Sequence, residues 1–152
     1  MTARVFVDSN VLTYARDASE GDKQRRAIEW MDYLWRSKSG RVSIQVLQEF
    51  YVTVTRKLKP GLSAAAARAD VRELMAWHPT MLDAKILEGA FQAEDRHRLS
   101  FWNALIVSAA RASGCDYVLT EDLQDGQSLD GVVIVNLFRH GPDSLRRIAP
   151  SA

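Results

Sequence analysis

The sequence predicts a single α/β domain over residues 1–152, with helices on both faces of a central, mostly parallel sheet of four to five short strands. Short apolar runs that suit buried strands alternate along the chain with longer segments of helical periodicity. This alternation is typical of a three-layer α/β/α arrangement. A length of 152 residues, with 47% apolar and 26% charged residues, suits one globular domain with its own core.

Local sequence features predict each strand and helix in the first half of the chain. Residues 5–7 (Val-Phe-Val) are a short apolar run, consistent with a buried strand, and a helical turn begins soon after them. The helix expected over residues 22–37 has its apolar residues on one face, and a glycine stops it. A very short strand is expected at residues 41–43. Its last residue, a serine, can cap a helix over residues 43–57.

The second half contains more capped helices and the remaining strands. A Pro-Gly pair breaks the chain before the next helix. Three helices are expected to begin at a serine or an aspartate, over residues 63–75, 83–96 and 100–112. Residues 78–81 are a weak strand candidate, and the apolar runs 117–119 and 132–135 complete the sheet.

Composition narrows the classes of protein. No apolar run approaches the roughly 20 residues that span a bilayer, and a strand follows the first few residues without a secretory signal. Cys115 is the only cysteine, so no internal disulfide forms and a cytoplasmic location is expected. We expect Cys115 to be a small buried residue. The net charge of +1 creates no overall field that demands a nucleic-acid partner.

Acidic residues occur where predicted strands end and helices or loops begin. Asp8 and Asp122 each follow a strand, so in a parallel sheet they can share the edge where sites form. Glu49 lies in a helix among apolar residues, where a charge is costly unless it is paired. Carboxylates that converge repel one another and require a cation, and hard divalent metals carry out phosphate chemistry well. The alternatives are that Asp8 is only a turn residue and that Glu49 points outward.

An amide occupies a fourth position of the same kind. Asn103 falls in the first turn of a helix capped by Ser100, where backbone N–H groups favour an anion or an oxygen ligand. Its neighbours are apolar, so the amide needs a hydrogen bond or a ligand. Asn10 and Thr120 are small polar residues that can orient the carboxylates.

Four segments together resemble the PIN-domain family of metal-dependent ribonucleases, and within it the VapC-type toxins of toxin–antitoxin pairs. The resemblance covers nearly the whole chain and rests on Val5–Leu12, Ser43–Phe50, Leu99–Ile106 and Leu119–Leu123. Each segment alone is weakly specific, but the four occur in the right order and at the right places in the fold. The resemblance therefore implies a three-layer PIN-like domain.

The resemblance also implies a reaction, a cofactor and partners. The reaction is endonucleolytic hydrolysis of RNA. Asp8, Asn103 and Asp122 would hold one or two Mg²⁺ or Mn²⁺ ions, and Glu49 would hold a second ion or orient a metal-bound water. The partners are a small antitoxin and a second copy of the chain, in a homodimer or a hetero-oligomer. The candidates for an antitoxin groove or a dimer surface are Trp30, Tyr33, Trp35, Tyr51 and Trp77, with the core as their alternative place.

Asn103 departs from the family pattern, which has an Asp at this position. An amide oxygen can still bind a hard cation, but it adds no negative charge and cannot act as a base. The departure is either natural, in an impaired enzyme, or introduced to disarm a toxic nuclease. A second interpretation is therefore a catalytically decayed module that binds protein or RNA.

Two other enzyme classes fit the sequence less well. A phosphatase with an Asp nucleophile would have a second Asp two residues after Asp8, where this chain has Asn10. Trapping a covalent phosphoaspartate would favour that class. The second class is the nucleotide-binding switches and dehydrogenases. These proteins bind phosphate with a glycine-rich loop, and the sequence contains no such loop.

Overall fold

The computed structural model describes residues 2–146, and one five-stranded sheet lies at its centre. The strands are β1 (Val5–Val7), β2 (Gly40–Arg41), β3 (Tyr117–Leu119), β4 (Ser128–Leu129) and β5 (Val132–Val135). Their order is β2-β1-β3-β5-β4, and all neighbours are parallel except β4, which pairs antiparallel with β5. The predicted mostly parallel sheet is confirmed.

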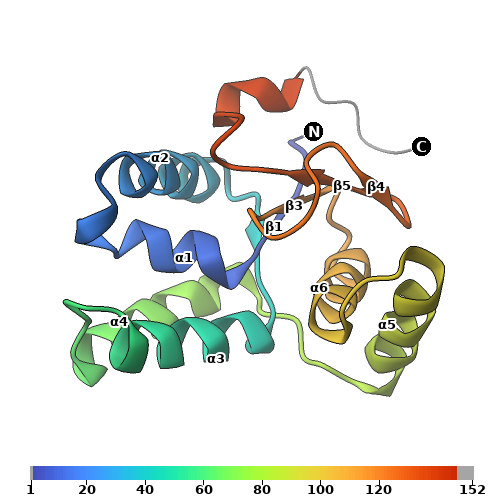
Figure 1. Cartoon of the computed structure of the whole chain (residues 1–152), viewed down its shortest axis with the longest axis horizontal. Helices are drawn as coiled ribbons and strands as arrows, with labels where there is room; N and C mark the ends of the chain where they lie inside the picture. The colour runs from blue at the N-terminus through green and yellow to red at the C-terminus, as the bar shows by residue number, and fades with distance from the viewer. Residues whose placement is uncertain (1, 147–152) are drawn as a thin grey trace.

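Helices flank this sheet, as Figure 1 shows, with α1 and α2 on one side and α5 and α6 on the other. The α-helices are α1 (Ser9–Ala15), α2 (Gly21–Ser37), α3 (Ile44–Val52), α4 (Ala64–Leu74), α5 (Ala84–His97) and α6 (Phe101–Ala112). The shorter helical turns are Ala18–Glu20, Thr53–Lys57, Met75–Trp77 and Pro142–Arg146. Helix α3 packs against both α1 and α4, and α5 packs along α6.

Local capping explains where most helices begin. Ser43, Ser63, Asp83 and Ser100 each accept a hydrogen bond from the backbone amide three residues on. A side-chain oxygen at this position satisfies one of the N–H groups that the first helical turn leaves unpaired. These four predicted starts are therefore confirmed to within a residue.

Two predicted boundaries are wrong, and one short strand is absent from the prediction. The edge strand is Gly40–Arg41, not residues 41–43, and Ser43 instead forms an isolated bridge with Thr80. The α-helix that begins after Ser43 ends at Val52, and a π-helical turn replaces it over Thr53–Lys57. Strand β4 was not predicted. A two-residue strand has no periodicity of its own and depends on its partner.

The core decides which aromatic side chains are available to a partner. Strands β1, β3 and β5 are fully buried, as expected for a sheet covered on both faces. Trp30 and Trp77 are buried in this core, so neither forms a docking surface, whereas Tyr33, Trp35 and Tyr51 pack against it while partly exposed.

The described residues also settle two smaller expectations. Cys115 is buried, as expected, and burial raises the pKa of its thiol to about 11. Over residues 2–146, none of the helices has the length and apolar character to cross a membrane.

Candidate active site

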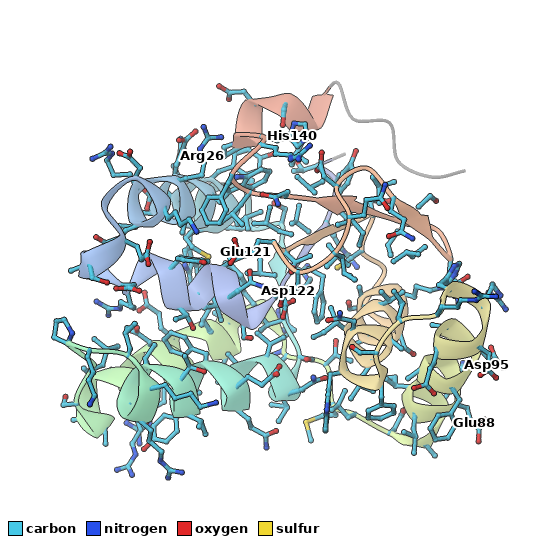
Figure 2. All side chains as sticks on the ribbon, viewed as in Figure 1. Arg26, Glu88, Asp95, Glu121, Asp122 and His140 are labelled. Atoms are coloured by element: carbon cyan, nitrogen blue, oxygen red, sulfur yellow. The ribbon has the colours of Figure 1, made fainter. Side chains whose placement is uncertain are left out.

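The pairing of β1 with β3 brings the first two candidate residues together. Val7 lies opposite Leu119 in this parallel pair, so the residues that follow them, Asp8 and Thr120, leave the sheet at the same level. The Asp8 amide continues the ladder by donating to the Leu119 carbonyl at 3.1 Å. Asp122 lies two residues beyond Thr120, and Figure 2 shows it beside the start of α1.

The Thr120 hydroxyl links the two aspartates. It is fully buried and donates to Asp8 Oδ2 at 2.9 Å, while it accepts the backbone N–H of Asp122 at 3.1 Å. A hydroxyl can do both because it has one proton and two lone pairs. Thr120 therefore fixes the Asp8 carboxylate and the path of the loop that carries Asp122.

Asn10 completes the cluster from the first turn of α1. Its Nδ2 lies 3.1 Å from Asp122 Oδ2, 3.0 Å from Thr120 Oγ1 and 3.5 Å from Asp8 Oδ2. All three neighbours are oxygens, so the amide must direct its NH₂ group toward them. Its Oδ1 is then directed away, and this buried oxygen has no hydrogen-bond partner among the described residues.

One side of the cluster of Asp8, Asn10, Thr120 and Asp122 is buried, and the other side is exposed. Asp8 is only 5% exposed, and burial raises the pKa of its carboxyl, with a further contribution from the negative charge of Asp122. The hydrogen bonds from Thr120 and from the Ser9 amide oppose this rise. Asp122 is exposed to solvent. The site can therefore receive a large substrate at its Asp122 side.

Glu49 approaches the cluster from α3, the helix that packs against α1. Its side chain is exposed at the surface, yet the pKa of its carboxyl is raised, first by partial loss of water and next by the charge of Asp8. Asp122 contributes in the same direction. Three carboxylates from three different segments thus act on one another electrostatically.

Asn103, the fourth candidate ligand, comes from a different helix. It lies in the first turn of α6, where its backbone N–H donates to Ser100 Oγ at 3.2 Å. The side chain is partly buried, and no hydrogen bond joins it to Asp8, Glu49 or Asp122 within the described part of the chain. The structure brings Asp8, Asn10, Thr120 and Asp122 into contact and Glu49 into electrostatic range, while the described residues show no hydrogen bond between the Asn103 side chain and this group.

The donor set suits a hard divalent cation in kind. It consists of carboxylate and amide oxygens, and the unpaired Oδ1 of Asn10 is the type of ligand that such ions accept. Over residues 2–146, no three His, Cys, Asp or Glu side chains lie close enough together to hold a metal ion. The three acidic side chains therefore do not form a complete metal site without amide oxygens or a shift of a side chain.

A second contact beside the site has no signal in the sequence. The Tyr14 hydroxyl donates to Glu121 Oε1 at 2.5 Å, and burial together with this carboxylate raises the pKa of Tyr14. Phe138 meets the Tyr14 ring edge-on, and the Lys23 ammonium lies over both rings. Glu121 precedes Asp122, so this contact restrains the same loop. It joins residues 107 positions apart, which no local pattern reveals.

Asp125 further restrains the loop. Its Oδ1 accepts the Asn136 amide at 2.9 Å, and its Oδ2 lies 2.8 Å from His140 Nε2. These contacts lower the pKa of the Asp125 carboxyl against the opposing effect of burial. His140 therefore anchors the loop of the candidate site to the end of β5.

Asp130 lies on the turn between β4 and β5, and its partners lie at the end of α5. The side chain of Asp130 is 5% exposed and contacts Arg96 and His97. These contacts lower the pKa of its carboxyl, although burial opposes them. They connect the end of α5 to the sheet.

Comparison with known proteins places the chain in a family. A family model described as the PIN domain matches residues 5–124. The chain belongs to the PIN-domain family. Nucleases of this family generally use divalent metals. The match covers the segments that carry Asp8, Glu49, Asn103 and Asp122. No curated protein matches this PIN domain.

Solved structures with the same fold include VapC toxins. VapC20 of Mycobacterium tuberculosis, described as a sarcin–ricin loop cleaving toxin, is 24% identical, with a TM-score of 0.57 over 75% of this chain and 86% of that one. A toxin–antitoxin complex from Klebsiella pneumoniae is 13% identical, with a TM-score of 0.62 over 88% and 97% of the two chains. VapBC2 from Rickettsia felis, bound to a promoter DNA fragment, is 13% identical, with a TM-score of 0.58 over 87% and 97%. At these identities the likeness establishes the shared fold.

Proposed function

We propose that this PIN domain is a metal-dependent endoribonuclease and the toxin of a toxin–antitoxin pair. The observation that carries the proposal is the cluster at the carboxyl ends of β1 and β3. There, Asp8 and Asp122 share the Asn10 amide, and Glu49 is affected by the charge of both. Sites in parallel sheets form at this edge, and the membership of the PIN family supports nuclease chemistry.

Each residue has a proposed role. Asp8, Asp122 and Asn103 would hold one or two Mg²⁺ or Mn²⁺ ions, with Glu49 at a second ion or orienting a water. When bound, the ion supplies charge neutralisation for the phosphate and lowers the pKa of a nucleophilic water. Thr120 and Asn10 position the carboxylates. Because Asp122 is exposed, an RNA phosphate can reach the site from solvent.

An RNA cleavage assay with Mn²⁺ tests the proposal. The chain with Asn103→Asp is expected to cleave faster than the parent, because a fourth carboxylate strengthens metal binding. Asp8→Asn in either background is expected to abolish cleavage while circular dichroism shows an intact fold. Cleavage by Asp8→Asn at the parent rate would refute the assignment.

The second candidate function is a decayed module that binds protein or RNA. The observation in its favour is the Asn at position 103, whose side chain makes no hydrogen bond to the acidic cluster within the described residues. Under this alternative, the chain would bind RNA with or without Mn²⁺, and Asn103→Asp would leave cleavage absent. Titration of both forms with Mn²⁺ before the cleavage assay separates the two functions.

We propose an antitoxin as the protein partner, in line with the toxin–antitoxin assemblies among the structural neighbours. An apolar groove of about 460 Å³ between α3 and α4 suits an amphipathic helix. Tyr51, Val71 and Met75 line it, and Arg68 and Arg72 flank it, so acidic residues beside the helix's apolar face are expected. Homodimer formation, a single domain over residues 1–152 and a cytoplasmic location remain predictions from the sequence.

A further inference from the structure

Gln45 is a buried polar residue of α3 whose amide interacts with the Glu49 carboxyl one turn later in the helix. It is the second residue of α3, beside Val46 and Leu47 of the core, and it is only 5% exposed. Among the described residues, neither its Oε1 nor its Nε2 has a hydrogen-bond partner. Buried amides are nearly always paired, so an orphaned one at this depth indicates a group outside the protein or a second side-chain position.

The geometry of α3 directs Gln45 toward the acidic cluster. Residues 45 and 49 are one turn apart and lie on one face of the helix. Side chains of a helix lean toward its N-terminus, so the carboxylate of Glu49 lies over the turn that contains Gln45. The Gln45 amide is close enough to oppose the rise in the pKa of Glu49, but the pair falls short of hydrogen-bond geometry.

The charges around Glu49 explain why an amide is useful there. Glu49 lies within the electrostatic influence of Asp8 and Asp122, and like charges repel one another. An N–H donor one turn below can hold that carboxylate on the inner side of the helix without adding charge. A carboxylate at position 45 would increase the repulsion, and an apolar residue would provide no donor.

We propose that Gln45 is a positioning residue of the candidate metal site, with Nε2 holding the Glu49 carboxylate toward the ion and Oε1 accepting a hydrogen bond from a water at that site. The inference rests on the proposed nuclease function and deepens it. Gln45 acts through Glu49 and does not touch the reacting phosphate. In metal sites, partners of this kind change affinity by about 10- to 100-fold when they are lost.

The test is the substitution Gln45→Met, which keeps the length and most of the volume of the side chain but removes the amide. Its matched control is Gln48→Met, on the exposed part of the same helix. Both are made in the parent chain and beside Asn103→Asp. Mn²⁺ affinity is measured by calorimetry, and stability without metal by thermal unfolding.

The expected result is a loss of Mn²⁺ affinity of about 10-fold or more for Gln45→Met, with little change in stability without metal, because the contact of Gln45 with the half-buried Glu49 is weak in the metal-free fold. Gln48→Met should change neither quantity. Under the proposal, Gln45→Met also lowers kcat for RNA cleavage more than it raises KM, since a displaced Glu49 affects the chemical step.

Two other outcomes overturn the inference and are distinguishable. If the unsubstituted forms bind Mn²⁺ and Gln45→Met binds it equally well, Gln45 only fills the core and the nuclease proposal stands. If neither the parent nor its Asn103→Asp form binds Mn²⁺, the metal site itself is absent, and both proposals are wrong.

Discussion

Replacing Thr120 by valine tests whether the buried hydroxyl supports the candidate site. Valine nearly matches threonine in shape, so the change removes the hydroxyl and leaves the packing largely as it was. Three contacts end with it: the bond to Asp8 Oδ2 at 2.9 Å, the Asn10 amide at 3.0 Å and the Asp122 amide at 3.1 Å. We expect the loss to fall mainly on Asp8, which is buried and charged.

The size of the stability loss depends on whether each former partner of the hydroxyl can form another hydrogen bond. A hydrogen bond to a charged group contributes about 1.5 to 3 kcal/mol, and Asp8 has little access to water as a substitute. Asn10 keeps its contact with Asp122 Oδ2, and Asp122 is exposed, so their losses are small. We therefore expect Thr120→Val to lower the free energy of unfolding by about 2 to 3 kcal/mol at neutral pH.

The dependence on pH supplies the sharper test. The pKa of Asp8 in the folded protein lies above its ordinary value of 3.8, so its carboxyl becomes protonated in the fold before it does in the unfolded chain. The charged hydrogen bond from Thr120 is therefore fully present above the folded pKa and is lost as the pH falls through it. The deficit of Thr120→Val should be smaller at pH 4 than at pH 7, because only a neutral hydrogen bond remains to be lost once the Asp8 carboxyl is protonated.

Urea unfolding followed by circular dichroism measures this deficit at both pH values. Thr120→Ser is the matched control, since it keeps the hydroxyl and loses one buried methyl, at a cost of about 1 kcal/mol that does not depend on pH. Equal losses for the two variants at neutral pH, or a Thr120→Val deficit that is the same in acid, would refute the reasoning.

Three further predictions concern the site and the sheet. Asp8→Asn should abolish RNA cleavage, and its free energy of unfolding should depend less on pH than that of the parent, because it removes a group whose pKa differs between the folded and the unfolded chain; urea unfolding at pH 7 and pH 4 beside the cleavage assay checks this. Asn103→Asp should raise Mn²⁺ affinity in calorimetry, and equal affinities would place position 103 outside the metal shell. Gly40→Ala should destabilise the fold by about 1 to 3 kcal/mol in urea unfolding, because a Cβ there would lie 2.5 Å from the ring of Trp77.

The helix starts could be predicted from the sequence because they depend on local hydrogen bonds. Ser63, Asp83 and Ser100 cap helices through bonds to amides three residues away, so their effect can be recognised within a few residues of sequence. The pairing of β4 with β5 and the bridge of Ser43 to Thr80 depend on residues that only the folded chain brings together. Boundaries at such places could not be derived from periodicity.

Some residues of the candidate site could likewise be predicted from the sequence, and others could not. That Asp8 and Asp122 lie at one edge could be inferred, because parallel neighbours present their carboxyl ends together. Gln45 could not be recognised, since a glutamine in a helix is ordinary until its burial and missing partners are known. The contact of Tyr14 with Glu121 was also hidden, because it joins the end of one helix to a distant loop.

The hydrogen bonds of the cluster separate what folding requires from what a ligand would require. The Thr120 hydroxyl donates to Asp8, and the Asn10 amide donates to Asp8, Asp122 and Thr120, so the fold itself keeps the two carboxylates in place. Among the described residues, the buried side-chain atoms without a hydrogen bond of good geometry include Asn10 Oδ1 and the Gln45 amide near the cluster, and Trp77 Nε1 and Asp130 Oδ2 elsewhere. Buried polar atoms of this kind reduce stability, and natural proteins retain them mainly at functional sites. Gln45 and Asn10 both lie beside the acidic residues, so adding Mn²⁺ to the parent and to Gln45→Met tests whether a bound ligand satisfies these atoms.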